Sequence, residues 1–165
     1  MTLWIISAVS FRKEHHLPGH FWPSGERSEL VKRKRLLDSF AMIAYLNKEK
    51  GFENVRGVMA EAQKSGDSVL MNEINVGEVY YILFRKRGPE KADYFIETIL
   101  ASLPILTVSN GFADVINAAK IKAEHSLSFA DCFAVDTARK YNAVIMTGDP
   151  EFKRVEQLVE IEWLD

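Results

Sequence analysis

Four acidic residues, widely separated along the chain, each follow or begin a segment with a regular apolar pattern. They are Asp38, Glu78, Asp131 and Asp149. Two carboxylates about 4 Å apart repel each other by ~1 kcal/mol in water and by ~4 kcal/mol at a surface-like dielectric. A cluster of four would therefore be unfavourable or partly protonated unless a divalent cation offset the charge. All-oxygen ligands suit Mg²⁺ or Mn²⁺ rather than zinc.

The chemistry that such a cluster indicates is hydrolysis of a phosphodiester. A divalent ion can lower the pKa of a water molecule and stabilise the charge that develops on a phosphate. The set consists of acids alone and includes no histidine, thiolate or serine as a nucleophile, so an ion rather than a side chain would activate the attacking group. The pattern therefore favours metal-assisted hydrolysis over covalent catalysis.

Each acid also has an ordinary structural explanation. Asn75 and Glu78 have the spacing of a helix capping box, and so do Ser128 and Asp131. Asp149 precedes a proline and fits a turn, and Asp38 fits a simple junction between a strand and a helix. Capping accounts for acids at helix starts, but it gives no reason for an apolar strand to end in Asp38.

The elements that would position these acids alternate between strands and helices. Apolar runs predict strands at residues 35–38, 68–74, 104–108 and 143–148, with a last one at the sheet edge in 159–164. Helical spacing predicts helices at 39–50, 52–66, 75–88, 89–102 and 110–125, and another within 126–142. Ser39 is expected to cap the first of them. This alternation predicts an α/β fold, a three-layer α/β/α arrangement with a mostly parallel central sheet. Ligands bind such sheets beyond the carboxyl ends of the strands, where the four acids are expected to converge.

Length and composition limit the classes of protein that the chain can belong to. The 165 residues suggest one domain, and 47% hydrophobic with 27% charged residues is ordinary for a globular protein. The apolar runs are too short to cross a membrane. Cys132 is the single cysteine, so no internal disulfide can form, which fits the cytoplasm. The net charge of −2 is unusual for a nucleic-acid binder, although basic residues cluster at Lys32–Arg35, Arg85–Arg87, Arg139–Lys140 and Lys153–Arg154.

Residues 1–30 differ from the rest and are expected to form an irregular N-terminal extension. A short apolar start is followed by His, Pro, Gly and Trp residues without a period. One short strand or helix is expected near Leu3–Val9, and a basic segment typical of a signal peptide is missing. The extension would be a start-site artefact if translation began at Val31. Residues 31–165 are expected to form the folded domain.

Three stretches of the chain resemble the PIN-domain ribonucleases, and among them the VapC toxins of toxin–antitoxin pairs. They are LLDSFAMIAYL, NEINVGEVYYIL and LSFADCFAVDTARKYNAVIMTGDPEF. The resemblance covers about residues 33–162. It implies an Mg²⁺- or Mn²⁺-dependent endoribonuclease that cuts RNA and slows translation. It also implies a VapB-like antitoxin as partner, and a homodimer.

The resemblance also implies roles for individual residues. Asp38, Glu78, Asp131 and Asp149 match the acidic metal set of the family. Three polar positions match residues that support this set, namely Ser39, Asn75 and Thr147. Gly148 departs from the family pattern, because many relatives carry a polar or acidic side chain there. The extension at residues 1–30 has no counterpart in the family.

Two other functions remain open from the sequence. The first is a catalytically inactive domain that only binds a partner. The second is a phosphatase of the haloacid dehalogenase type, which needs two acids two residues apart, whereas residues 38–40 read Asp-Ser-Phe. Asp136, about 500° around the helix from Asp131, is expected to be a surface acid. Tyr80, Tyr81 and Phe84 are expected in the core or on a dimer face rather than on a base-stacking platform.

Overall fold

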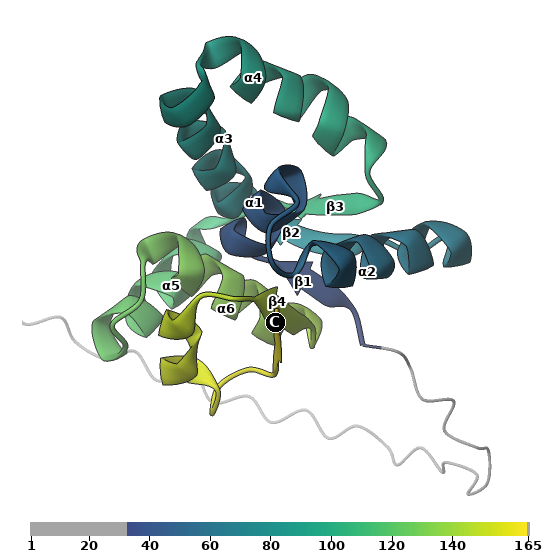
Figure 1. The fold of residues 1–165 in the computed structure, drawn as a ribbon. Helices are drawn as coiled ribbons and strands as arrows, with labels where there is room; N and C mark the ends of the chain where they lie inside the picture. The colour runs from purple at the N-terminus through teal and green to yellow at the C-terminus, as the bar shows by residue number, and fades with distance from the viewer. Residues whose placement is uncertain (1–32, 165) are drawn as a thin grey trace, which may run out of the picture. The chain divides into compact units, whose positions relative to one another are not determined.

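A single parallel sheet organises the part of the chain that the structure describes, residues 33–164. The structure is a computed structural model. Five strands are hydrogen-bonded in the order β3-β2-β1-β4-β5, and every neighbouring pair is parallel (Figure 1). The strands are β1 (Arg35–Leu37), β2 (Val69–Asn72), β3 (Ile105–Val108), β4 (Val144–Thr147) and β5 (Ile161–Trp163). The expectations for residues 1–30, including the element near Leu3–Val9, lie outside the described residues.

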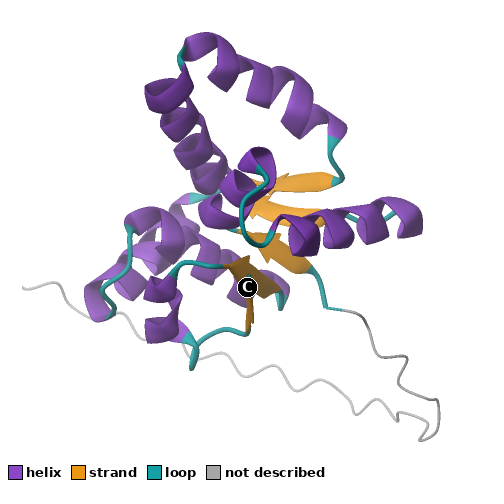
Figure 2. Ribbon diagram, in the orientation of Figure 1, coloured by secondary structure: helices purple, strands orange, loops and turns teal. Residues whose placement is uncertain are grey.

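Helices connect the strands and cover both faces of the sheet (Figure 2). They are α1 (Ser39–Asn47), α2 (Phe52–Ser65), α3 (Glu73–Arg87), α4 (Pro89–Tyr94) with the π-helical segment η1 (Phe95–Leu100), α5 (Phe112–Glu124), α6 (Phe129–Tyr141) and the 3-10 segment η2 (Pro150–Val155). The side chains of α1 to α4 pack on one face, and those of α5, α6 and η2 pack on the other. The predicted three-layer α/β/α fold with a parallel sheet is confirmed.

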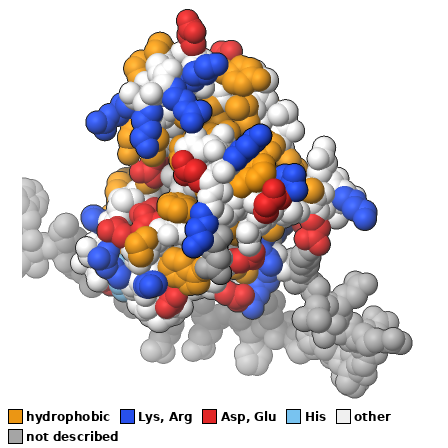
Figure 3. All heavy atoms as spheres, in the orientation of Figure 1, with side chains coloured by type: hydrophobic (Ala, Val, Ile, Leu, Met, Phe, Trp, Pro, Cys, Tyr) orange, Lys and Arg blue, Asp and Glu red, His pale blue; other side chains and the backbone are white. Residues whose placement is uncertain are grey.

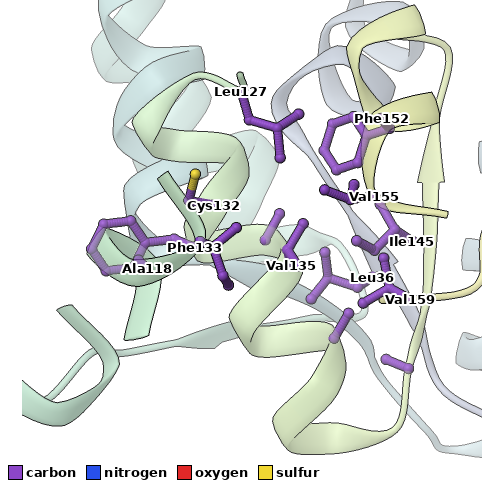
Figure 4. Close-up of a cluster of buried hydrophobic side chains, with 14 of the residues drawn as sticks. Leu36, Ala118, Leu127, Cys132, Phe133, Val135, Ile145, Phe152, Val155 and Val159 are labelled. Atoms are coloured by element: carbon purple, nitrogen blue, oxygen red, sulfur yellow. The ribbon is translucent and has the colours of Figure 1, made fainter. Parts of the chain in front are cut away.

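Alternating side chains of the central strands supply the two cores. Leu36, Leu70 and Ile145 face α5, α6 and η2, where they pack with residues such as Phe152 and Val155 (Figure 4). Leu37, Met71 and Met146, one residue further along each strand, face α1 to α4. Successive strand residues point to opposite faces of a sheet, so strands covered on both sides must be apolar at every position. This explains why the central strands read as continuous apolar runs.

Every element that was predicted within residues 33–164 is present, with shifted ends. The first helix ends at Asn47 instead of residue 50, and the second strand ends at Asn72 instead of residue 74, so that α3 begins at Glu73. The Asn72 side chain accepts a hydrogen bond from the Ile74 amide at 2.9 Å and caps this helix. The predicted last strand is β5, which lies at an edge of the sheet as expected. No helix in residues 33–164 is long and apolar enough to cross a membrane.

Candidate functional site

The candidate site lies where the strand order reverses. From β1 the chain moves outward to β2 and β3 on one side, and later to β4 and β5 on the other. In parallel sheets, the crevice beyond the carboxyl ends of the two strands at such a point is the usual place for a ligand. Here these strands are β1, which leads into Asp38, and β4, which ends at Thr147.

Asp38 is the most deeply buried of the four acids. It is 1% exposed and caps α1, because its carboxylate accepts a hydrogen bond from the Ala41 amide at 2.8 Å. The pKa of Asp38 is raised to about 7, chiefly by burial and to a smaller extent by the charges of Asp131 and Asp149. Hydrogen bonds from the Ala41 amide and the Thr147 hydroxyl lower this pKa without cancelling the effect of burial. A positive charge beside Asp38 would therefore relieve a real electrostatic cost.

Thr147 connects the first acid to the fourth. Its side chain is fully buried at the end of β4, and its hydroxyl accepts a hydrogen bond from the Asp149 amide at 3.0 Å. The same hydroxyl bonds the carboxylate of Asp38. Asp149 is half-buried and caps η2 by accepting a hydrogen bond from the Glu151 amide at 2.8 Å. The hydrogen bonds of Thr147 thus connect the turn after β4 to the turn after β1.

Ser39 connects the first acid to the second. Its hydroxyl donates to Oε2 of Glu78 at 2.6 Å. Asn75, fully buried one turn before Glu78, donates from Nδ2 to Ser39 Oγ and to the Ala130 carbonyl, both at 3.3 Å. Asn75 Oδ1 is buried without a hydrogen-bond partner. The hydrogen bonds of Asn75 therefore connect α3 to the starts of α1 and α6. They hold the segments that carry Asp38, Glu78 and Asp131 in fixed relative positions.

Asp131 enters the site from the first turn of α6. This helix leads into the amino end of β4, so its own N-terminus points to the carboxyl edge of the sheet. Ser128 caps the helix, because its hydroxyl accepts from the Asp131 amide at 3.1 Å. Burial raises the pKa of Asp131 to about 6, with further contributions from the charges of Glu78 and Asp149 and opposing hydrogen bonds from Ser128.

The mutual effects on pKa show that the four carboxylates lie near one another. The charges of Asp131 and Asp149 raise the pKa of Asp38, and the charges of Glu78 and Asp149 raise the pKa of Asp131. In this conformation, however, the four carboxylates do not form a metal-binding site. Among the described residues, no three His, Cys, Asp or Glu side chains could hold a metal ion as they stand. Asp38 and Asp149 each direct one carboxylate oxygen toward the backbone amide that they cap.

The structure corrects several sequence interpretations. Asn75 and Glu78 are not a capping box, because Asn72 caps α3 and Glu78 lies in its second turn. Asp38, rather than Ser39, caps α1. The capping explanation is correct for Ser128. It also applies to Asp38, so the position of that acid after a strand does not by itself indicate a catalytic role.

Other corrections concern residues outside the four acids. Asp136 is not a surface acid: it is 9% exposed, and its pKa is raised by burial and by the charge of Asp114. Tyr81 and Phe84 are 47% and 46% exposed, so of the two expected locations the core is excluded for them and a dimer face stays a prediction. The sequence reading also overlooked Asn72, which is fully buried and donates to the Thr137 hydroxyl at 2.8 Å. The available signal was a polar residue at the end of an apolar strand, as at Asp38.

Two of the four basic clusters lie far from the acids along the sheet. Arg35 begins β1 and pairs with Glu162 at 2.6 Å, and Arg33 pairs with Glu160. Lys140 lies in the last turn of α6, which also reaches the amino edge. Of the other two clusters, Arg85–Arg87 forms the last turn of α3, about two turns beyond Glu78, and Lys153–Arg154 lies in η2, which follows Asp149. Figure 3 shows Lys and Arg side chains gathered over the turn between α3 and α4, where the first of these two clusters ends.

Comparisons with known proteins agree with this fold. The family model described as PIN domain matches residues 35–158. A search of curated proteins gives no match. Among solved structures, VapBC2 from Rickettsia felis bound to a promoter DNA fragment is similar at a TM-score of 0.63 and 15% identity, covering 79% of this chain and 98% of that one. DNA-bound VapBC from Salmonella typhimurium has a TM-score of 0.61 and 17% identity, covering 81% and 99%. Mycobacterium tuberculosis VapC20, described as a sarcin-ricin loop cleaving toxin, has a TM-score of 0.55 and 17% identity, covering 73% and 93%.

Proposed function

The chain belongs to the PIN domain family, and on that premise we propose that it is a divalent-metal-dependent endoribonuclease that hydrolyses RNA phosphodiesters. We further propose that it is the toxin of a type II toxin–antitoxin pair. One observation carries the nuclease proposal. Four acids lie in or beside four different elements, α1, α3, α6 and η2. Two of them, Asp38 and Asp131, are buried, and the charges of neighbouring acids of the set help to raise their pKa.

The donor chemistry of the site fits Mg²⁺ or Mn²⁺. Every candidate ligand is an oxygen, as these hard cations prefer, and no thiolate or imidazole is among them. Binding by three of the carboxylates requires at least one of them to leave its present orientation. When bound, the ion would lower the pKa of a water molecule and stabilise charge on the phosphate.

The chain's own residues have distinct parts in this proposal. Asp38, Glu78 and Asp131 would hold the catalytic metal directly or through water, and Asp149 would complete the set or hold a second ion. Ser39 and Thr147 keep Glu78 and Asp38 in place through their hydroxyls. Asn75 fixes the distance between α3 and α6. The basic clusters at Arg85–Arg87 and Lys153–Arg154 would contact the RNA backbone, which contributes affinity rather than sequence choice.

The nuclease proposal predicts that RNA cleavage depends on added metal. Purified protein should cleave single-stranded RNA with Mg²⁺ or Mn²⁺ and should not do so with EDTA. Calorimetry should record heat of metal binding that is absent in Asp38→Asn. If the wild-type protein folds but binds neither ion and cuts no RNA, the nuclease proposal is wrong and the inactive partner-binding module is the better interpretation.

The toxin proposal includes two protein partners, an antitoxin and a second copy of this chain, and it places the activity in the cytoplasm. A VapB-like antitoxin would bind this chain, since antitoxins accompany the similar toxins named in VapBC structures. A homodimer is part of the proposal, and the exposed apolar side chains of Phe112, Val115 and Ile116 on α5 offer a surface for it. Action on cellular RNA would take place in the cytoplasm, where the single buried thiol of Cys132 needs no oxidising environment.

The toxin role predicts an effect on growth. Induced expression of the wild-type chain in a bacterium should arrest growth, and expression of Asp38→Asn at the same level should not. Co-expression of an antitoxin encoded immediately upstream should restore growth to the wild-type strain. Arrest by both variants would indicate overexpression stress instead of nuclease action.

A further inference from the structure

An exposed aromatic ring lies at the mouth of the acid site. Phe40 is the second residue of α1, two positions after Asp38, and 42% of its surface is exposed. The other side chains at the start of this helix, Ser39 and Ala41, are buried. Because the Phe40 side chain is only partly buried, its burial contributes little to the stability of the fold. Its position calls for another explanation.

Gly148 provides the surface against which this ring packs. A Cβ atom built on Gly148 would lie 2.4 Å from Phe40 Cε1 and 2.8 Å from Cζ. These distances are too short for any side chain, so the ring occupies the space that a residue other than glycine would need. Gly148 stands between Thr147 and Asp149. The Phe40 ring therefore extends from the first turn of α1, which Asp38 caps, onto the turn after β4, which leads to Asp149.

Two other exposed aromatic residues near the acids have different contacts. Tyr81, 47% exposed, hydrogen-bonds Glu78 through its hydroxyl at 3.4 Å. Phe129, 46% exposed, packs against Phe133 with 5.1 Å between the ring centroids. Phe40 differs from both, because its ring packs against the backbone of the turn that carries Asp149. It is the ring whose position is tied to both central strands of the site.

We propose that Phe40 binds the substrate by stacking on an unpaired base next to the phosphate that is cut. This inference rests on the proposed nuclease function and adds one contact to it, between the Phe40 ring and an unpaired base of the RNA. A base can stack on an aromatic ring only when it is free of its neighbours, as in loops and single strands. The exposed surface of Phe40 is apolar and carries no hydrogen-bonding group, so stacking would tolerate any base.

Binding measurements with matched variants test this proposal. Calcium replaces magnesium to prevent cleavage, and the probe is a short fluorescein-labelled single-stranded RNA of mixed sequence. Phe40→Leu, which keeps apolar bulk but removes the ring, should weaken binding by on the order of tenfold. Phe40→Trp should retain wild-type affinity. An oligomer of abasic ribose phosphates should bind wild type and Phe40→Leu equally, because it offers no base.

A second variant tests the packing against Gly148. Gly148→Ala introduces the Cβ that collides with the ring, so it should displace Phe40 and weaken RNA binding by a similar factor. The double variant Phe40→Leu/Gly148→Ala should then bind no more weakly than either single variant, whereas independent effects would multiply. Calorimetric affinity for Mn²⁺ alone should be unchanged in Phe40→Leu.

The outcomes separate this inference from the nuclease proposal. If wild-type protein binds and cuts RNA but Phe40→Leu does so equally well, the stacking role is wrong and the nuclease proposal stands. If Phe40→Leu and Phe40→Trp both retain RNA binding but lose binding to a protein partner, Phe40 is a protein contact instead. If wild-type protein neither binds nor cuts RNA, both proposals are wrong.

Discussion

Asp38→Asn is expected to abolish RNA cleavage while making the metal-free protein more stable at neutral pH. The carboxylate is 1% exposed, and burial together with two neighbouring acids raises its pKa to about 7. An asparagine keeps the shape of the side chain, and its oxygen can still accept the Ala41 amide that caps α1. The substitution therefore removes the unfavourable charge and a metal ligand while retaining the cap.

The gain in stability should depend on pH in a defined direction. A raised pKa means that the folded protein binds the proton more tightly than the unfolded chain does. The stability associated with this proton is fully present below the ordinary pKa of 3.8 and is lost as the pH rises through about 7. Asp38→Asn cannot lose it, so the two proteins should be nearly equal at low pH. Between low pH and neutrality, the free energy of unfolding of Asp38→Asn should come to exceed that of the wild-type protein by an amount on the order of a few kcal/mol.

Thermal unfolding across this pH range measures the effect, with and without Mg²⁺. Added Mg²⁺ should raise the Tm of the wild-type protein and leave that of Asp38→Asn unchanged, because ligand binding stabilises only the form that binds it. Asp38→Ala serves as the control for the cap, since it should lose about 1 kcal/mol relative to Asp38→Asn. A variant that unfolds at lower temperature than wild type at every pH, yet still cuts RNA, would show that Asp38 is structural.

The fold could be predicted from the sequence because its strands are buried on both faces. Leu36-Leu37 and Val144–Met146 have no polar interruption, so their apolar runs identify them without knowledge of their partners. The strand order β3-β2-β1-β4-β5 was not part of the sequence prediction. The acids could be assigned to one edge because each was predicted just after a strand or near the start of a helix, although Glu78 lies in the second turn of α3.

Details that depend on tertiary pairing could not be predicted in this way. The segment NEIN contains two asparagines, and either could cap a helix. Pairing of Asn72 with Val108 across the sheet keeps this residue in β2, so the helix begins immediately after it. The contact between Phe40 and Gly148 is also invisible in the sequence, because 108 residues separate them (148 − 40 = 108). Such contacts exist only when the ends of β1 and β4 are side by side.

Asp136 illustrates a different limit. Helical geometry correctly separates it from the face of Asp131, but it does not reveal what covers the opposite face. Asn117 of α5 hydrogen-bonds its side chain, and Asp114 lies near enough to raise its pKa. The sequence gives the angle between two residues on one helix, whereas burial depends on the neighbouring helix. This second buried acid on α6 provides a control for the first.

Asp131→Asn should therefore lose activity and Asp136→Asn should retain it, while the two substitutions have similar effects on stability. Both acids lie on α6, are less than a tenth exposed and have a pKa raised chiefly by burial. Only Asp131 lies among the other candidate ligands, where Glu78 and Asp149 contribute to its pKa. Loss of Asp131 should lower the rate of RNA cleavage by about a hundredfold or more, whereas loss of Asp136 should leave it within about twofold.

Initial cleavage rates and Mn²⁺ affinities of the two variants, measured at the same pH, test this contrast. Neither variant should be less stable than the wild-type protein near pH 8, because each loses a charge that burial disfavours. Asp131→Asn should show no Mn²⁺ heat in the range where Asp136→Asn binds normally. Equal loss of activity in both variants would mean that cleavage responds to the packing of α6 as a whole, and the assignment of Asp131 as a ligand would be wrong.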